Sequence, residues 1–289
     1  MNKLKGLVLI VTCITSLQAH AQQADTNLIE FENSYFYHIT GKENSKLILY
    51  MHGGVSNPFF KQHQNDIEVG ELLEDNRVFV AQAIAAGYDV LLPITNDSLN
   101  WLTRHEYCFR TFMKCLDSNA LKYREKYISG FSDGGTGSFK IFYSHPEAFD
   151  GLIVFNGHPH YRHFARSVNY SLITDKKILF FGTTKDKVMH YEFMLTEYCK
   201  QKTSNPNTYL YLRAGDHSFK CYNEEDAAVV FDILNAEADN VKTDPIHGYI
   251  RKDTVLSFYK YRKSIYRKYR HGLEYYKLNK QQKAVYNKS

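Results

Sequence analysis

The stretch that decides the fold is YISGFSDGGTGSF, residues 127–139. It contains Gly130-Phe131-Ser132-Asp133-Gly134, a G-x-S-x-G pattern that directly follows a short apolar run of β-forming residues and directly precedes a segment with helical character. A strand that turns into a helix through such a pattern lifts the central hydroxyl out of the backbone. The same five residues also occur by chance in plain glycine turns, so the rest of the chain has to distinguish the two readings.

Predicted strands and helices alternate along most of the 289-residue chain. Its composition, 44% hydrophobic and 23% charged, is that of an ordinary globular protein. Most strands are apolar at successive positions, as in strands buried on both faces, so we predict an α/β fold with a mostly parallel sheet and helices on both faces. After an opening strand or hairpin in residues 27–41, the predicted strands are residues 47–51, 88–94, 126–131, 149–157, 176–184 and 208–215. The predicted helices are residues 71–86, 99–121, 134–143, 188–202 and 224–236.

The N-terminus resembles a secretory signal. Lys3 and Lys5 precede an apolar stretch over residues 7–17, and Ala19-His20-Ala21 fits the small-x-small cleavage rule, so we expect residues 1–21 to be removed and the protein to be exported to the periplasm or outside the cell. The apolar stretch is shorter than a membrane span. The residues that end at Cys13 faintly resemble a lipoprotein cleavage box, which leaves a lipid anchor as an alternative.

Four polar or glycine-containing segments follow predicted strands at what should be one edge of the sheet. Sites in parallel sheets form at the carboxyl ends of the strands, because loops converge there and helix N-termini face the ligand. The segments are His52-Gly53-Gly54 after residues 47–51, Ser132 after 126–131, Asp186 after 176–184, and Asp216-His217 after 208–215. A serine, an acid and a histidine therefore follow three different strands in this chain order.

In this order, Ser132 within its G-x-S-x-G pattern, Asp186 and His217 resemble the nucleophile, acid and histidine of serine hydrolases of the α/β-hydrolase superfamily. The resemblance covers roughly residues 28–237 and is specific for fold and triad but poor for substrate. The HGG motif and the export signal are similar to those of secreted esterases, such as feruloyl esterases and polyhydroxyalkanoate depolymerases, and of prolyl-oligopeptidase-type peptidases. The resemblance implies a small cap insertion over the site, at about residues 158–175, and no metal or organic cofactor.

The chemistry needs these residue types. A serine hydroxyl is a poor nucleophile until an imidazole takes its proton, and His217 can do so only when Asp186 holds its other ring nitrogen. The negative charge of a tetrahedral intermediate needs preformed donors, for which we expect the backbone N–H of Asp133 and that of Gly54 or its neighbour in the HGG loop.

Other residues compete for these roles less well. Asp175 precedes its strand and so lies at the wrong end of the sheet, and Asp216 is adjacent to His217, which makes the geometry awkward. We expect His52 to orient the glycine loop rather than to act in catalysis.

The polar insertion at residues 158–175 supplies candidate substrate contacts, namely His158 and Arg162, with Arg166 as a second partner for a substrate carboxylate. His158, His160 and His163 have a spacing that zinc could use, but no cysteine or well-spaced carboxylate within the insertion completes a closed site. We therefore predict a polar loop that lines the substrate cleft, and no metal.

Export would allow disulfides among Cys108, Cys115, Cys199 and Cys221. On one unbroken helix the first two would lie on the order of 10 Å apart, beyond the roughly 4.4 to 6.8 Å between bridged Cα atoms. Cys199 and Cys221 flank one predicted strand, so we expect them to form a bridge, with free buried thiols as the alternative.

The last 39 residues, 251–289, are basic, with 12 Lys or Arg against 2 acids in a chain whose net charge is +5. Apolar side chains recur there at spacings of three and four, as in a helix with one apolar face. We expect residues 238–289 to form a basic, Tyr-rich helical extension of a hydrolase domain at residues 22–237. The extension either packs on that domain or holds the protein on an anionic surface or polymer, and we expect no nucleic-acid partner.

The sequence thus predicts a secreted serine hydrolase that cleaves carboxylic esters of a small molecule or a polymer through an acyl-enzyme on Ser132. A peptidase or amidase with the same triad is the enzymatic alternative. A non-catalytic binding protein that uses its basic tail is the alternative from another class.

Overall fold

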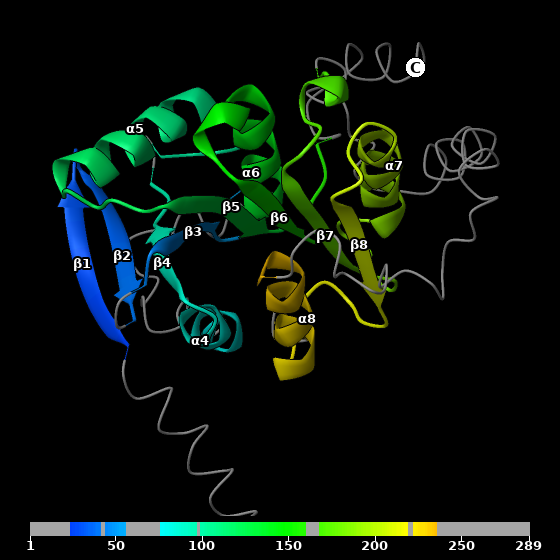
Figure 1. The fold of residues 1–289 in the computed structure, drawn as a ribbon, viewed down its shortest axis with the longest axis horizontal. Helices are drawn as coiled ribbons and strands as arrows, with labels where there is room; N and C mark the ends of the chain where they lie inside the picture. The colour runs from blue at the N-terminus through cyan, green and yellow to red at the C-terminus, as the bar shows by residue number, and fades with distance from the viewer. Residues whose placement is uncertain are drawn as a thin grey trace, which may run out of the picture.

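A single eight-stranded sheet organises the protein. The structure is a computed structural model that describes residues 24–41, 44–55, 76–96, 99–159, 168–218 and 222–235. The strand order is β1-β2-β4-β3-β5-β6-β7-β8 (Figure 1). The strands are β1 (Asp25–Phe31), β2 (Ser34–Thr40), β3 (Lys46–Met51), β4 (Tyr88–Pro93), β5 (Glu125–Phe131), β6 (Gly151–Phe155), β7 (Lys177–Thr183) and β8 (Thr208–Arg213). β2 is antiparallel to β1 and to β4, and all other neighbours are parallel, so the predicted mostly parallel sheet is confirmed.

Helices cover both faces of this sheet, as predicted. One face carries α5, α6 and α7, and the other carries α4 and α8 (Figure 1). Their bounds are α4 (Arg77–Ala85), α5 (His105–Ser118), α6 (Asp133–Ser144), α7 (Tyr191–Lys202) and α8 (Glu224–Asn235). Because β3 and β5 to β8 run parallel to one another, their carboxyl ends lie at one edge of the sheet.

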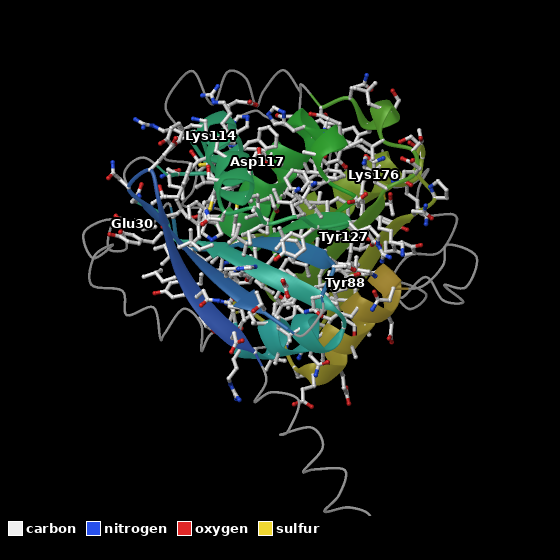
Figure 2. The ribbon with its side chains drawn as sticks, turned by 60° about the vertical axis from the view of Figure 1, so that its left-hand side comes forward. Glu30, Tyr88, Lys114, Asp117, Tyr127 and Lys176 are labelled. Atoms are coloured by element: carbon white, nitrogen blue, oxygen red, sulfur yellow. The ribbon has the colours of Figure 1, made fainter. Side chains whose placement is uncertain are left out.

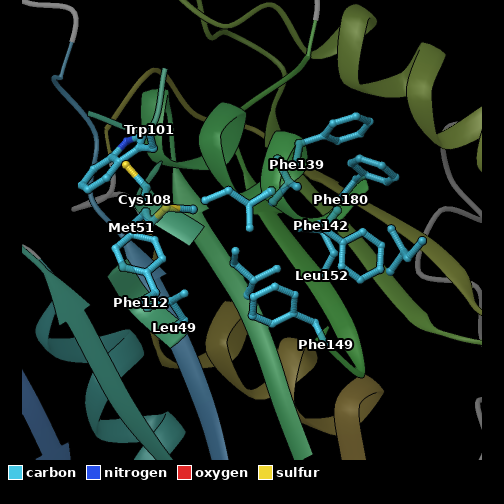
Figure 3. Close-up of a cluster of buried hydrophobic side chains, with 14 of the residues drawn as sticks. Leu49, Met51, Trp101, Cys108, Phe112, Phe139, Phe142, Phe149, Leu152 and Phe180 are labelled. Carbon is cyan, nitrogen blue, oxygen red and sulfur yellow. The ribbon is translucent and has the colours of Figure 1, made fainter. Parts of the chain in front are cut away.

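The larger core cluster lies between the sheet and α5 to α7. Figure 3 shows Phe112 of α5 beside Met51 of β3 and Phe139 of α6 beside Phe180 of β7, and all four side chains are buried. Trp101 joins this cluster from the loop before α5, and α6 accommodates it because Gly137 has no Cβ, which would lie 2.5 Å from the Trp101 ring. The helix that follows the serine is thereby packed tightly in place.

The opposite face has its own aromatic core. The rings of Tyr88 and Tyr127, which lie side by side in Figure 2, meet edge to face with centroids 5.6 Å apart. The Tyr88 ring also contacts Phe231 of α8 at 5.6 Å, and Phe231 stacks on Phe79 of α4. Strands β3 to β7 are thus apolar on both faces, because helices cover both faces of the sheet.

The opening segment is a hairpin. Glu32 and Asn33 connect β1 to β2 with φ of 47° and 60°. Two successive residues with positive φ match the twist of a two-residue hairpin turn, and asparagine adopts this conformation readily.

Two helices begin later in the structure than the sequence predicts. α5 begins at His105 rather than at residue 99, and the Asn100 side chain accepts the backbone N–H groups of Leu102 and Thr103 in the turn before it. α7 begins at Tyr191 rather than at residue 188, and the Asp186 carboxylate accepts the N–H groups of the two residues after Lys187 in the turn before it. In both places a side chain satisfies backbone donors of the turn that precedes the helix.

Several predictions lie outside the described residues. They are the signal at residues 1–21, the extension at 238–289, residues 160–167 of the cap insertion, and residues 71–75 of the first predicted helix. Within the described ranges, no helix is long and apolar enough to cross a membrane.

The predicted disulfide is not formed at Cys199, which is a free, buried thiol on α7, whereas Cys221 lies outside the described residues. The physical reason is packing, since Cys199 points into the core cluster beneath α7. Cys108 and Cys115 are also free and buried, both on α5. Burial raises the thiol pKa to about 12 at Cys108, about 11 at Cys115 and about 12 at Cys199.

Candidate active site

Ser132 stands at a strained turn between β5 and α6. Its φ of 56° and ψ of −118° lie in a region that residues with a Cβ rarely adopt. The turn is tight because glycines flank it: a Cβ on Gly130 would lie 2.4 Å from the Gly134 carbonyl carbon, and one on Gly134 would lie 1.9 Å from the Met51 carbonyl oxygen. The Ser132 N–H donates to the Phe155 carbonyl at 2.9 Å, which anchors the turn to β6.

The structure brings Ser132, His217 and Asp186 together in one chain of hydrogen bonds. Ser132 Oγ lies 2.9 Å from His217 Nε2, and Asp186 Oδ2 lies 2.7 Å from His217 Nδ1. Ser132 is 6% exposed, while the side chain of Asp186 is fully buried and that of His217 is 19% exposed. Three residues that are far apart in sequence thus form the contact geometry of a nucleophile, a base and an orienting acid.

The Asp186 carboxylate is buried but well supplied with donors. Its Oδ1 accepts the backbone N–H groups of Val188 at 2.8 Å and Met189 at 2.7 Å, and its Oδ2 accepts from Asn156 Nδ2 as well as from His217. Burial by itself raises the pKa of Asp186, but the hydrogen bonds and charge of His217, with Asn156 and the Met189 N–H, outweigh it and hold that pKa below its usual value. The group is therefore ionised at neutral pH.

Two aromatic residues that the sequence pattern does not single out support this chain of hydrogen bonds, one against His217 and one against Asn156. The Phe131 ring stacks on the imidazole with centroids 5.0 Å apart and an angle of 28° between the planes. The Tyr222 ring meets Phe131 edge to face, and its hydroxyl donates to the side-chain oxygen of Asn156. Phe131 lies inside the quoted G-x-S-x-G pattern, but nothing in that pattern indicates stacking on a histidine 86 positions later.

His52 orients the glycine loop after β3, as expected. Its Nδ1 donates to the Gly53 carbonyl at 2.8 Å, because its Nε2 accepts the Thr95 N–H at 3.3 Å. Burial lowers the pKa of His52 to about 4, against a smaller opposite effect of the Gly53 hydrogen bond, so the ring is neutral. A Cβ on Gly53 would lie 3.1 Å from Ser132 Cβ, and Gly54 has a φ of 82°, so the loop runs directly beside the serine.

The two predicted oxyanion donors lie in the elements that flank Ser132. Asp133 is the first residue of α6, so its backbone N–H lies at the N-terminus of that helix. Gly54 belongs to the loop just described. Helix N-termini and glycine loops are suited to bind a developing negative charge.

Of the remaining candidates, the structure describes His158 and Asp175. His158 is buried, with its ring 4.9 Å from that of Phe193, and its carbonyl accepts the Thr136 hydroxyl. Arg162 lies outside the described residues. Asp175 precedes β7 and so lies at the opposite end of the sheet, as expected. Among the described residues, no group of three or more His, Cys, Asp or Glu side chains is placed to hold a metal ion.

Comparisons with known proteins support the fold. No protein-family model and no curated protein sequence matches the chain. Esterase Pf2001 of Pyrococcus furiosus superposes with a TM-score of 0.54 at 15% identity, over 75% of this chain and 93% of that one. Est1E from Butyrivibrio proteoclasticus gives 0.51 at 12%, over 72% and 97%. An acylaminoacyl peptidase gives 0.53 at 11%, over 81% of this chain and 44% of that one.

With strand order β1-β2-β4-β3-β5-β6-β7-β8 and these structural neighbours, the chain has the α/β-hydrolase fold. The fold class predicted from the sequence is therefore confirmed.

Proposed function

We propose that the protein is a serine hydrolase that cleaves carboxylic esters through an acyl-enzyme on Ser132. The observation that carries the proposal is the pair of hydrogen bonds at His217, 2.9 Å to Ser132 Oγ and 2.7 Å to Asp186 Oδ2. A structural serine on a helix N-terminus needs neither a strained backbone nor an imidazole, whereas the nucleophile of a G-x-S-x-G turn has both.

In the first half-reaction, Ser132 Oγ attacks the ester carbonyl carbon while His217 Nε2 takes the hydroxyl proton. Asp186 holds the other ring nitrogen, so that Nε2 is the free base, and it stabilises the imidazolium that forms. His217 then gives the proton to the leaving alcohol, and an acyl group remains on Ser132. Water attacks this ester in the second half-reaction, with His217 again as base and then acid.

The oxyanion of each tetrahedral intermediate would accept the N–H groups of Asp133 and Gly54. One such donor is worth about 3 to 4 kcal/mol of transition-state stabilisation in comparable enzymes. This role gives a reason for the glycine loop to be held against the serine by the buried His52.

Two other readings remain as alternatives to be tested. A peptidase uses the same acyl-enzyme on an amide, and an acylaminoacyl peptidase is among the structural neighbours. A binding protein on the same scaffold would have no use for the Ser132 strain.

The proposal includes export, which rests on the N-terminal sequence, and an ester substrate that is either small or part of a polymer. Contact of the basic extension with an anionic surface also remains a proposal.

The test combines a fluorophosphonate label with a substrate panel. We expect wild type to be labelled at Ser132 and to hydrolyse p-nitrophenyl esters faster than aminoacyl-nitroanilides of matched size. Ser138→Ala is the matched control, because Ser138 is a buried serine of α6, the helix that follows Ser132, and its hydroxyl donates to the Gly135 carbonyl. Faster cleavage of the anilides would favour the peptidase, and labelling that survives Ser132→Ala would reject the serine mechanism.

A further inference from the structure

Asn156 occupies the carboxyl end of β6, between the strand that leads to Ser132 and the strand that leads to Asp186. It is 2% exposed and has a φ of 44°, a conformation that asparagine tolerates better than most residues. Its N–H donates to the Phe181 carbonyl at 2.8 Å, so its backbone is fixed to β7. A buried polar side chain is therefore presented at the same sheet edge as the proposed catalytic groups.

The Asn156 amide is held on both sides. Its Nδ2 donates to Asp186 Oδ2 and, at 2.7 Å, to Thr183 Oγ1, and its Oδ1 accepts the Tyr222 hydroxyl. The flipped amide would turn Oδ1 toward the carboxylate, where two acceptors would repel each other. Both amide protons and the amide oxygen are thus used, and the orientation is determined by the partners.

The oxygen that Asn156 contacts is the one that receives His217. Asp186 Oδ2 accepts from both Asn156 Nδ2 and His217 Nδ1, while Oδ1 is held by two backbone N–H groups. Thr183 continues the network, because its hydroxyl donates at 2.8 Å to the carbonyl of Asp216, the residue before His217. The amide therefore ties the loop of the acid to the loop of the histidine.

We propose that Asn156 is a positioning residue, which holds the Asp186 carboxylate toward His217, and that Tyr222 in turn fixes the Asn156 amide. The inference rests on the proposed function in one respect, namely that Asp186 orients His217 as the base. Asn156 acts through Asp186, so its loss should reduce turnover more than substrate affinity.

The first experiment measures kcat and KM per fluorophosphonate-titrated site in Asn156→Gly, Tyr222→Phe and the double variant. Glycine keeps the positive φ and removes only the side chain. We expect kcat to fall roughly 10- to 100-fold in Asn156→Gly, the effect of one hydrogen bond to a charged group, and roughly 3- to 10-fold in Tyr222→Phe. KM should stay within about threefold of wild type, because the uniform binding of substrate is unaffected. The double variant should match Asn156→Gly, since Tyr222 acts through Asn156.

The matched control is Asn205→Ala. Asn205 is also fully buried, and its Nδ2 donates to the Lys176 carbonyl at 2.7 Å, just before β7 begins and so at the far end of the sheet. Its loss should lower the melting temperature without changing kcat per titrated site. This comparison separates positioning from general loss of stability.

The second experiment needs no substrate. Proton NMR of Ser132→Ala protein, with and without Asn156→Gly, follows the His217 Nδ1–H resonance, which hydrogen bonding to Asp186 shifts downfield and protects from exchange. We expect the resonance to be lost or moved upfield in Asn156→Gly and retained in Asn205→Ala. Tyr222→Phe, which removes a single oxygen, gives the same readout more weakly and serves if Asn156→Gly does not fold.

The two proposals fail in different ways. Wild-type turnover per site and an unchanged Nδ1–H resonance in Asn156→Gly would overturn the positioning role while Ser132→Ala still abolished labelling. Labelling that survives Ser132→Ala would overturn the serine mechanism, and the NMR comparison would still decide whether Asn156 holds Asp186. Additive losses in the double variant would remove Tyr222 from the inference.

Discussion

Gly134 of α6 and Met51 of β3 touch backbone to backbone: a Cβ on Gly134 would lie 1.9 Å from the Met51 carbonyl oxygen and 2.6 Å from that of His52. The last residue of β3 is also paired with Gly130 of β5, so it has little room to move. The Ser132 turn and the glycine loop are thereby held at contact distance.

Gly134→Ala should therefore destabilise the protein and displace the serine. Overpacking of a fixed backbone costs about 1 to 3 kcal/mol or more, and we expect loss of fluorophosphonate labelling with a lower midpoint of urea unfolding. Gly87→Ala is the control, because Gly87 has a φ of 89° but no atom within 4 Å of a built Cβ. It should cost only the roughly 1 to 2 kcal/mol of left-handed strain, with ester hydrolysis unchanged. Equal effects of the two substitutions would contradict the contact argument.

We expect the strained backbone at Ser132 to lower the stability of the folded protein. Ser132→Ala and Ser132→Gly should both lower kcat by roughly 10⁴ to 10⁶. Ser132→Gly should in addition be more stable than Ser132→Ala by about 1 to 2 kcal/mol, because glycine adopts the φ of 56° without strain. Urea denaturation of the two variants measures the difference, and equal stabilities would mean that the turn carries no such strain.

His52 should make the fold sensitive to mild acid. The unfolded chain gains a proton on His52 below about pH 6.5, whereas the folded protein does not until pH falls to about 4, since burial lowers the pKa there. The unfolded state therefore binds more protons in this window, and stability is full above it and falls as pH drops through it, by about 3 kcal/mol in total. Asp186, whose pKa is also lowered, contributes only at still lower pH.

Urea unfolding at pH 7.5, 5.5 and 4.5 measures this dependence in wild type and in His52→Asn. Asparagine can still donate to the Gly53 carbonyl but does not titrate. Burial also lowers the pKa of His38 and of His105, so some pH dependence should remain in the variant. Parallel curves for the two proteins would show that His52 does not contribute.

The described cysteines should be unreactive in the folded protein. Burial raises all three thiol pKa values, so the thiolate that reacts is scarce at pH 8. Iodoacetamide should modify Cys108, Cys115 and Cys199 only after denaturation. Peptide mapping without reductant then checks the pairing, and a peptide that links Cys199 to Cys221 would contradict the free thiol.

The sequence predicts the main parts of the fold and of the site because both depend on periodicity and chain order. Apolar runs of strand length that alternate with helical segments indicate the layers. Ser132, Asp186 and His217 each stand just after a predicted strand, and a parallel sheet brings those positions to one edge. The two glycines that leave room for the tight turn at Ser132 can also be recognised from the sequence, because Gly130 and Gly134 lie within the quoted pattern.

The features that the sequence did not reveal depend on contacts between distant segments. Asn156 lies within the predicted strand at residues 149–157, whereas β6 ends at Phe155, and its contacts appear only with Asp186 and Tyr222 beside it. The turn before α7 also depends on such a contact. The Asp186 carboxylate accepts two backbone N–H groups of this turn, and the helical propensity of the segment contains no sign of these hydrogen bonds.

The position of β6 has a consequence for how the site tolerates change. Ser132 and Asp186 follow β5 and β7, the two strands that flank β6, so two strand spacings, roughly 10 Å, separate the ends of their strands. The His217 ring lies between the two side chains and is hydrogen-bonded to both, at 2.9 Å to Ser132 and 2.7 Å to Asp186. A residue inserted at the end of β6 would shift the Phe155 carbonyl from the Ser132 N–H and the Asn156 amide from Asp186, without altering Ser132, Asp186 or His217. The geometry of the site therefore depends on a strand that contributes none of these three side chains.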